Sequence, residues 1–165
     1  MKILNRSIIR YTISLIIFIG VLIGLTVFIT IKIIEDNIHK TYQDNGFIID
    51  INPKINKKLD KQLDIDGIYS PFNIINLTNN GKKRKYQIVL TPINNSDANI
   101  RVSVNNVLIR YLNNFDKVDD GYLLYENYLN EHYSISHQIR VWQSINSVVD
   151  NITVNFNLKV NILDE

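Results

Sequence analysis

The residues from Tyr11 to Ile31 form a long uncharged stretch near the start of this chain, without any Asp, Glu, Lys or Arg. Fourteen of them are Ile, Leu, Val or Phe, and each such residue favours membrane insertion by about 0.3–0.6 kcal/mol. As a helix this stretch would be about 31 Å long, close to the bilayer's hydrocarbon core of about 30 Å. We therefore predict a transmembrane helix over residues 11–34.

The charged residues on either side of this stretch predict its orientation. Lys2, Arg6 and Arg10 precede it, whereas residues 32–36 carry charges of both signs. Basic side chains beside a membrane helix stay on the cytoplasmic side, and acidic ones have little effect. We expect a single-pass protein of the cell membrane, in which residues 1–10 form a cytoplasmic basic tail. The C-terminal part of the chain is then extracytoplasmic.

A cleaved signal peptide is the alternative explanation of the apolar stretch. Such a peptide has an apolar region of about 7–15 residues, which ends in a small-residue site such as A-x-A. The stretch in this chain is longer, and the only alanine is Ala98. No cysteine follows it that could carry a lipid. These features favour an uncleaved signal-anchor, and they make the lipid bilayer the first expected partner.

Gly20 and Gly24 form a G-x-x-x-G pair within the apolar stretch. On a helix the two glycines share one face, where a second helix can approach closely. Glycine is also common in membrane helices for other reasons. Helix packing through Gly20 and Gly24 is therefore a hypothesis beside that simpler explanation.

The part of the chain that follows the helix carries no net charge. Residues 37–165 contain 14 Lys or Arg and 14 Asp or Glu. A nucleic-acid-binding domain normally has a basic surface, so we expect no nucleic acid among the partners. Residues 82–85 are all basic and follow the turn-forming pair Asn80-Gly81. We interpret them as a solvated turn, with contact to anionic lipid or wall polymer as the alternative.

The hydrophobic period is two in several segments after residue 71, which predicts strands with one buried face. The clearest case lies in residues 152–162, where Ile, Val, Phe and Leu alternate with Thr, Asn and Lys. Asn-Gly and Asp-Gly pairs separate such segments and favour tight turns. Pro92 is expected to end the second strand or to confine it to an edge. Strands are predicted at residues 73–77, 86–90, 100–105, 122–128, 133–142 and 152–162.

These strands predict the fold class. Several short strands without a long amphipathic helix are typical of a β-sandwich, and only residues 106–117 suggest a single helical turn. We predict a mainly β protein, in which one N-terminal transmembrane helix precedes an antiparallel β-sandwich over residues 72–165. The sandwich is expected to be immunoglobulin-like or jelly-roll-like.

Residues 35–71 differ from the segments on either side. Residues 52–66 are charged and weakly patterned, which we interpret as a stalk or linker. Residues 46–51 form an isolated strand-like run within it. Through Phe47, Ile48, Ile49 and Ile51 this run either begins the sandwich or pairs with a sheet edge of a neighbouring molecule, as exposed strands can.

The region from about Pro71 to Leu163 resembles the β-sandwich ectodomains of Firmicute surface proteins of the camelysin and biofilm-matrix-fibre type. Four segments carry this resemblance: residues 85–90 (KYQIVL), 123–125 (LLY), 134–142 with its IRVW end, and 157–160 (NLKV). The resemblance implies an extracellular structural sandwich. The processing site expected after the apolar segment is missing, which favours a membrane-tethered relative over a free fibre subunit.

No pattern in the chain predicts an enzyme or a cofactor. The sequence has no cysteine, which excludes disulfides, thiolate metal sites and a cysteine nucleophile. Asp119 and Asp120 precede Gly121 and are better explained as turn residues than as an acid–base pair. Glu131, His132 and His137 would have to meet across a turn to hold a metal, and their spacing matches no common metal motif.

Alternation places Gln138, Arg140 and Trp142 on the strand face opposite Ile139 and Val141. Trp and Arg are enriched in interface hot spots, so these three residues are a candidate interaction patch. The simpler explanation is that Trp142 covers the rim of the sandwich or stacks on Arg140.

We therefore expect a membrane-anchored extracytoplasmic sandwich that acts as a structural or protein–protein interaction module. Its partner would be another protein or a second copy of the chain, and residues 46–51 would permit self-association by strand addition. The alternative is a ligand-binding module for cell-wall glycan or lipid, which requires a concave aromatic or apolar surface.

Overall fold

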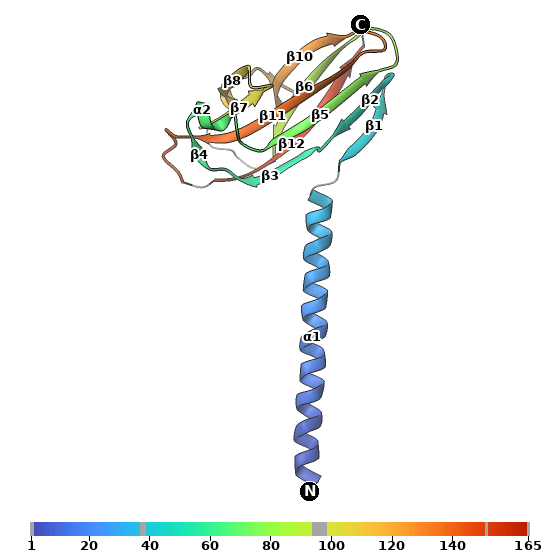
Figure 1. Cartoon of the computed structure of the whole chain (residues 1–165), viewed down its shortest axis with the longest axis vertical. Coiled ribbons are helices and arrows are strands. Elements are labelled where there is room, and N and C mark those ends of the chain that lie inside the picture. Colours follow the sequence, from blue (N-terminus) through green and yellow to red (C-terminus); the bar gives the residue numbers. More distant parts are fainter. Residues whose placement is uncertain (1, 37–38, 94–98, 151, 165) are drawn as a thin grey trace. The chain divides into compact units, whose positions relative to one another are not determined.

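A computed structural model describes residues 2–36, 39–93, 99–150 and 152–164 of this chain. It contains two compact units, which consist of residues 1–38 and 39–165. The first unit is the helix α1 (Lys2–Asp36), shown in blue in Figure 1. The second unit contains all the strands.

Helix α1 has the length and composition of a membrane span or a signal sequence. Its stretch Tyr11–Ile31 comprises 21 residues whose side chains are all exposed. The hydroxyl groups of Thr26 and Thr30 donate to the main-chain oxygens of Leu22 and Thr26, at 3.0 and 2.8 Å. These bonds satisfy the hydroxyl donors within the helix itself, which suits an apolar environment. Among the described residues, nothing beyond the helix backbone and the adjacent residues lies within 4 Å of a Cβ built on Gly20 or Gly24, so their role in helix packing stays a prediction.

The second unit is a β-sandwich of two sheets, which confirms the predicted fold class. The pairings are antiparallel, except that the short strand β4 runs parallel to β11. The first sheet has the order β1 (Lys40–Asp44), β2 (Phe47–Ile51), β5 (Phe72–Asn79), β11 (Ser134–Ser144), β7 (Ile100–Val104), β8 (Leu108–Tyr111), with β4 (Lys61–Gln62) beside the end of β11. The second has the order β3 (Lys54–Lys58), β12 (Thr153–Leu163), β6 (Arg84–Pro92), β10 (Gly121–Leu129), β9 (Lys117–Val118).

The connections between strands are those of a jelly roll. Strand β5 pairs with β11, β6 pairs with β10, and β7 pairs with β8, so three antiparallel pairs are nested along the chain. Members of successive pairs lie in alternate sheets. A long ribbon folded over in this manner is the jelly-roll arrangement. Of the two arrangements expected, the jelly-roll-like one describes this chain.

The core lies between the two sheets and contains the apolar side chains that alternation predicted. Strand β12 shows the pattern best, because every second side chain from Val154 to Ile162 is buried. Pro92 is the last residue of β6 and pairs with Phe156, so it ends the strand as expected. Within residues 106–117, the chain forms the short strand β8 and a single turn of 3-10 helix, η1 (Leu112–Asn114).

The prediction of a stalk at residues 35–71 is wrong for the residues after the helix. Strands β1 to β4 and the short helix α2 (Asp64–Gly67) occupy this region and belong to the sandwich. Strand β3 is rich in lysine because it lies at a sheet edge and buries only Ile55. Lysine on an edge strand discourages pairing with other molecules, so a real strand can have a stalk-like composition.

Of the two alternatives for residues 46–51, the structure supports the one in which they belong to the sandwich. Strand β2 lies between β1 and β5 and forms five residue pairs with each. Phe47, Ile49 and Ile51 are at most 1% exposed and contribute to the core, whereas Ile48 faces outward and is half-buried. Both edges of β2 are therefore occupied, and no further strand can be added there.

Two tight turns depend on asparagine in the left-handed backbone region. Asn45 and Gly46 connect β1 to β2 with φ of 47° and 87°. Asn105 and Asn106 connect β7 to β8 with φ of 56° and 59°. Asparagine tolerates this region better than most residues. In the second turn, the side chains of both asparagines also contact β11.

Candidate functional site

The predicted patch on β11 lies on the outer face of the first sheet, but it is not an open surface. Ile139 and Val141 point into the core, whereas Arg140 and Trp142 lie under the segment that contains α2. Trp142 is 1% exposed and Arg140 is 7% exposed. A partner therefore cannot reach these two side chains directly. Gln138 is half-buried at the end of the row.

Helix α2 covers Trp142 because it has a glycine at the point of contact. A Cβ atom on Gly67 would lie 2.2 Å from Cε2 of the indole ring, which is far closer than atoms can approach. The backbone of α2 therefore packs directly on the ring. This contact supports the simpler explanation, in which Trp142 is a packing residue. The residues that cover it belong to the region that the sequence suggested was a stalk.

Arg140 holds the end of the covering segment in place. Its Nε donates to the main-chain oxygen of Ser70 at 3.0 Å, and its Nη1 donates to Asn106 Oδ1 at 2.6 Å and Gln138 Oε1 at 3.0 Å. Its guanidinium carbon lies 4.6 Å from the ring centre of Phe72. Burial lowers the pKa of Arg140 from its usual value. The expected stacking of Arg140 with Trp142 is replaced by stacking with Phe72.

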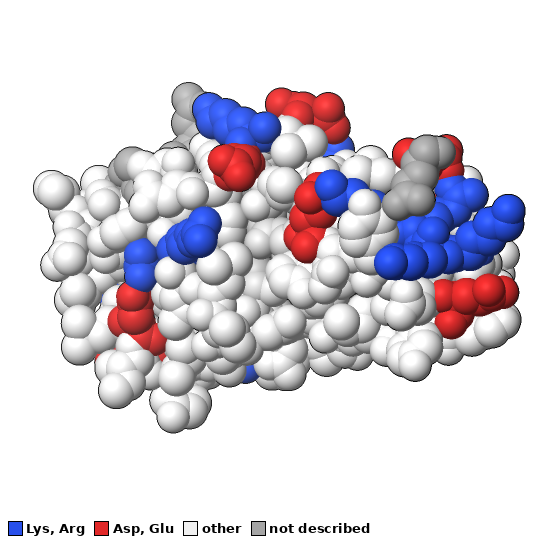
Figure 2. Space-filling model, turned by 90° about the horizontal axis from the view of Figure 1, so that it is seen from above, with Lys and Arg blue, Asp and Glu red and all other residues white. Residues whose placement is uncertain are grey.

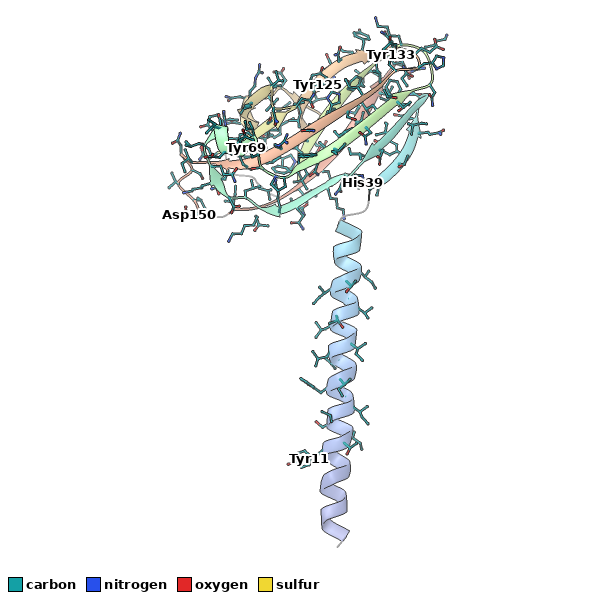
Figure 3. The ribbon with its side chains drawn as sticks, viewed as in Figure 1. Tyr11, His39, Tyr69, Tyr125, Tyr133 and Asp150 are labelled. Carbon is teal, nitrogen blue, oxygen red and sulfur yellow. The ribbon has the colours of Figure 1, made fainter. Side chains whose placement is uncertain are left out.

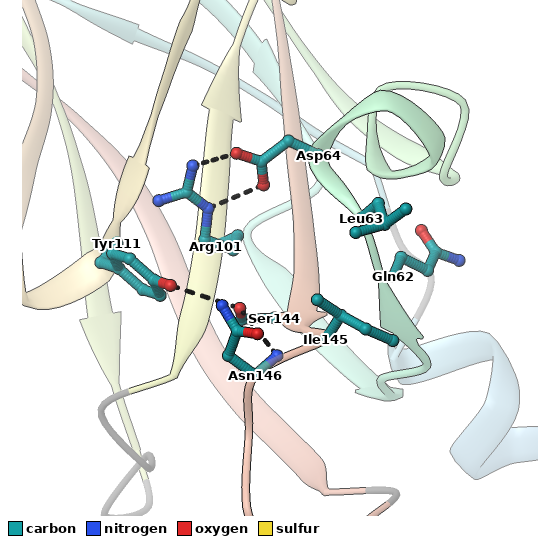
Figure 4. Close-up of a pocket in the computed structure, with 8 residues that line it drawn as sticks. All are labelled: Gln62, Leu63, Asp64, Arg101, Tyr111, Ser144, Ile145 and Asn146. Atoms are coloured by element: carbon teal, nitrogen blue, oxygen red, sulfur yellow. Dashed lines mark hydrogen bonds and ion pairs between the residues drawn. The ribbon is translucent and has the colours of Figure 1, made fainter.

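A cavity of about 330 Å3 opens beside this cover. Figure 4 shows the side chains around it, which come from the α2 segment, β7, β8 and the end of β11. Its lining combines charged, amide, hydroxyl and apolar groups: Gln62, Leu63, Asp64, Arg101, Tyr111, Ser144, Ile145 and Asn146. No spacing in the sequence connects these residues, so pattern analysis missed them.

Two residues, Asp64 and Tyr111, hold the side chain of Arg101 in the cavity. Its Nε donates to Asp64 Oδ1 at 2.8 Å, and its Nη2 forms a second bond to Asp64 Oδ2. The guanidinium carbon lies 4.3 Å from the ring centre of Tyr111. A bidentate Arg–carboxylate pair fixes both position and orientation. This pair connects α2 to β7 and thereby positions the cover over the sheet.

Hydroxyl groups form the opposite wall of the cavity. The Tyr111 and Ser144 hydroxyl oxygens lie 3.3 Å apart, and the main-chain N–H of Asn146 donates to Ser144 Oγ at 3.3 Å. These contacts are drawn as dashed lines in Figure 4. The cavity therefore combines these polar groups with two apolar side chains, Leu63 and Ile145, which are each about half exposed.

Further exposed apolar side chains lie on the two segments that supply Leu63 and Ile145 to this cavity. The segments are the α2 region and the loop after β11, and the main-chain N–H of Ile145 joins them by donating to the Gln62 oxygen at 3.1 Å. Figure 3 places Tyr69 and Asp150, one from each segment, at the same end of the sandwich. We call this set the α2 surface, and its members are Leu63, Ile65, Tyr69, Ile145, Val148 and Val149.

The degree of exposure distinguishes the α2 surface from ordinary surface hydrophobics. Val148 is 93% exposed, Tyr69 is 82% exposed and Ile65 is 68% exposed. Single exposed apolar residues are normal in proteins, but a group of them around a cavity is typical of an interaction site. Arg101 and Tyr111 add the residue types that contribute most to interface energetics.

The basic run at residues 82–85 has partners within its own domain. Arg84 forms an ion pair with Asp164, Lys85 lies 2.7 Å from Glu126, and the ammonium of Lys83 lies 5.0 Å from the ring centre of Tyr128. The bond to Glu126 raises the pKa of Lys85. Basic side chains gather at one end of the face in Figure 2, with acidic ones beside them. This mixture favours a solvated turn over an anion site.

The structure does not bring the three candidate metal ligands together. His132 is exposed on a turn beside Glu131, with 3.4 Å between Nε2 and Oε1. His137 is fully buried in the core, where both ring nitrogens contact other side chains. Asp119 and Asp120 lie on the turn before β10, and Asp120 is 3.6 Å from Lys159. In the described part of the chain, no group of three His, Cys, Asp or Glu residues could hold a metal ion.

The fold and this site define a class, which is a jelly-roll-like sandwich with an apolar N-terminal helix and a partly apolar cavity at one end. No protein-family model matches the chain, and neither a curated protein nor a solved structure shows significant similarity to it. The resemblance to camelysin-type surface proteins therefore stays a prediction.

Proposed function

We propose that this protein is a membrane-anchored interaction module. In this proposal α1 spans the membrane with residues 1–10 in the cytoplasm, and the sandwich binds a protein partner on the extracytoplasmic side. The uncharged stretch Tyr11–Ile31 supports the anchor, because its side chains are apolar and exposed. The basic residues before it support the orientation.

The orientation can be tested with single cysteines, because the natural chain has none. We would introduce Ser7→Cys and Ser134→Cys separately and label intact cells with a maleimide that does not cross membranes. Ser134 is exposed on β11, so its variant should be labelled on intact cells, and the Ser7 variant only after lysis. The reverse pattern would contradict the orientation. Release of the Ser134 variant into the medium would identify α1 as a cleaved signal.

The α2 surface is the observation that carries the binding part of the proposal. It combines highly exposed apolar side chains with an Arg–Tyr pair at the floor of a cavity. A protein partner that buries these apolar groups gains about 25 cal/mol for each Å2 removed from water. The bidentate bond between Arg101 and Asp64 keeps the site in one conformation before binding, which lowers the entropy cost of association.

Site-specific photo-crosslinking in intact cells tests this surface. A photoreactive amino acid at Val148 should give one discrete crosslinked product, and the same amino acid at Tyr133 should give none. Tyr133 is a matched control because it is 62% exposed and lies at the other end of the sandwich. Adding Ile65→Asp should remove the product without unfolding the protein. Equal products from both positions, or none from either, would refute the proposed surface.

The mass of the crosslinked product then distinguishes the two kinds of partner. A product of twice the mass of the chain identifies self-association, whereas any other mass identifies a different protein. Since β2 has neighbours on both edges, self-association through strand addition at residues 46–51 does not belong to this proposal.

The cavity itself favours a second candidate, a module that binds a cell-wall glycan fragment or a lipid head group. Tyr111, Leu63 and Ile145 supply apolar contacts beside polar groups, a combination that is common in ligand sites. Calorimetric titration of the full chain in micelles with soluble glycan fragments tests this candidate. A heat of binding that disappears in Tyr111→Ala would support this candidate function, and the absence of any heat of binding in the natural chain would exclude it.

A further inference from the structure

His137 is a buried ionisable group that the binding proposal does not use. It lies on β11 and is 0% exposed between the two sheets. Its ring centre is 4.7 Å from that of Tyr125 on β10 and 5.7 Å from that of Tyr86 on β6. Among the described residues, the imidazole forms no ion pair with a carboxylate. The environment therefore offers nothing to balance a positive charge on the ring.

The hydrogen bonds of His137 determine which nitrogen carries the proton. Asn105 Oδ1 accepts the main-chain N–H of Gln138 at 2.8 Å, so the other end of the same amide is the NH2 group. That NH2 group lies 3.1 Å from His137 Nδ1 and donates to it. Nδ1 is therefore the unprotonated acceptor of the neutral ring, and Nε2 donates to the Tyr86 oxygen at 2.8 Å.

A second proton on this ring would break the arrangement. Protonated Nδ1 and the Asn105 NH2 group would both be donors and would face each other across a hydrogen-bond distance. A rotation of the Asn105 side-chain amide would remove that repulsion. The rotation would, however, place the NH2 group of Asn105 against the main-chain N–H of Gln138. The turn between β7 and β8 would thus lose one of these two contacts in either case. Burial also lowers the pKa of His137, from its usual 6.5 to about 4.

The same turn is part of the hairpin that builds the cavity. Asn105 and Asn106 lie at the closed end of the β7–β8 hairpin, and Asn106 accepts a hydrogen bond from Arg140 on β11. Arg101 and Tyr111 lie opposite each other at the open end. The turn and the cavity are therefore the two ends of one short hairpin.

We propose that His137 is a pH-sensitive switch, whose protonation breaks its contact with Asn105 and loosens the β7–β8 hairpin from β11. Acidification then disturbs the cavity that Arg101 and Tyr111 line. The effect on partner binding rests on the proposed function, whereas the loosening of the hairpin is a property of the unbound protein.

Hydrogen–deuterium exchange of the full chain in detergent micelles tests this switch. Exchange rates at pH 7 and pH 4.5 are corrected for the intrinsic pH dependence of amide exchange. We expect residues 100–112 to lose protection by more than about tenfold relative to β12 when the pH falls, because the opened ring binds a proton more readily than the buried one. Equal loss in both segments, or no loss, would overturn the proposal.

Two variants separate a switch from a merely structural histidine. His137→Gln keeps an acceptor and a donor but cannot titrate, so its hairpin should exchange equally at both pH values after correction. Asn105→Asp keeps the acceptor for Gln138 and supplies a carboxylate to protonated Nδ1. It should raise the pKa of His137, as measured by NMR, and protect the hairpin in acid. An acid-labile hairpin in either variant would contradict the proposal. If His137→Gln fails to fold, Asn105→Asp alone still distinguishes a switch from a structural histidine.

The two proposals can fail independently. Loss of the Val148 crosslink at every pH, together with acid loosening of the hairpin, would refute the binding surface and leave the switch. A crosslink at pH 7 that persists unchanged at pH 4.5, without loosening of the hairpin, would refute the switch and leave the binding surface.

Discussion

Strand β11 is buried on both faces from Ile139 to Ser144, yet the two faces are buried in different ways. Its inner face carries Ile139 and Val141, which pack among apolar side chains of the opposite sheet. Its outer face carries Arg140 and Trp142, which are covered by a four-residue helix and the chain that follows it. The inner cover is a whole sheet, whereas the outer cover is a small segment held by one glycine contact and a few polar bonds.

This difference shows that position on a strand and burial are separate properties. Alternation correctly distinguishes the two faces, since it depends only on strand geometry. Whether the outer face is open depends on a segment that lies about 70 residues earlier in the chain. Ser70 belongs to this segment, and its main-chain oxygen accepts a hydrogen bond from Arg140. Because that cover is small, we expect the outer face to tolerate change better than the inner one.

The largest effect is expected from truncating the inner face. Ile139→Ala should lower the free energy of unfolding by about 2–5 kcal/mol, because it leaves a cavity between the sheets. Urea unfolding in micelles, followed by the fluorescence of Trp142, the only tryptophan, measures this change. Ile139→Val is the matched control, with an expected cost of about 0.5–1.5 kcal/mol. Equal costs for the two variants would mean that this face is not tightly packed.

A smaller effect is expected from disturbing the outer cover. Gly67→Ala would bring a methyl group against the Trp142 ring and should cost about 1–3 kcal/mol, as overpacking usually does. Combining Gly67→Ala with Trp142→Leu should cost less than the sum of the two single changes, because the smaller side chain makes room. Circular dichroism follows unfolding in all three variants. Strict additivity would show that α2 does not press on the ring.

The smallest effect is expected from the ion pair that joins the cover to the sheet. Asp64→Asn removes the charge that Arg101 faces, at a cost of about 0.2–1 kcal/mol, because Asp64 is 46% exposed. The cost should shrink at high salt, which screens exposed charges. Asp66→Asn serves as a control for the charge of the same helix. A salt-independent cost equal to that of the control would contradict a role for the pair.

The apolar stretch 11–31, the strand-like run 46–51 and the long strands β5, β6, β7, β10, β11 and β12 are visible in the sequence, because a membrane span needs length without charge and a half-buried strand needs period two. Strands β1, β3 and β4 and the short strands β8 and β9 are not visible in this way. The charged residues of β1, β3 and β4 suit a sheet edge as well as a linker, and only their pairing with β2, β12 and β11 decides between the two.

Sequence pattern also identifies only some of the residues of the candidate site. Arg140 and Trp142 were placed on the correct face, but their cover was not foreseen because α2 spans only four residues and has no periodicity to detect. No sequence pattern singles out Arg101, Tyr111 and Asp64, since they are separated in the chain and meet only through the pairing of β7 with β8 and the ion pair with α2.

The sequence by itself determined an apolar N-terminal helix, a mainly β domain and the inner and outer faces of its longest strands. These properties depend on local periodicity, which each segment carries independently of the others. The tertiary structure alone decided the burial of Trp142, the assembly of the cavity and the hydrogen bonds that hold His137 neutral. Those depend on contacts between distant segments, such as Gly67 against Trp142 and Asn105 against His137, and distant contacts leave no periodic trace in a single chain.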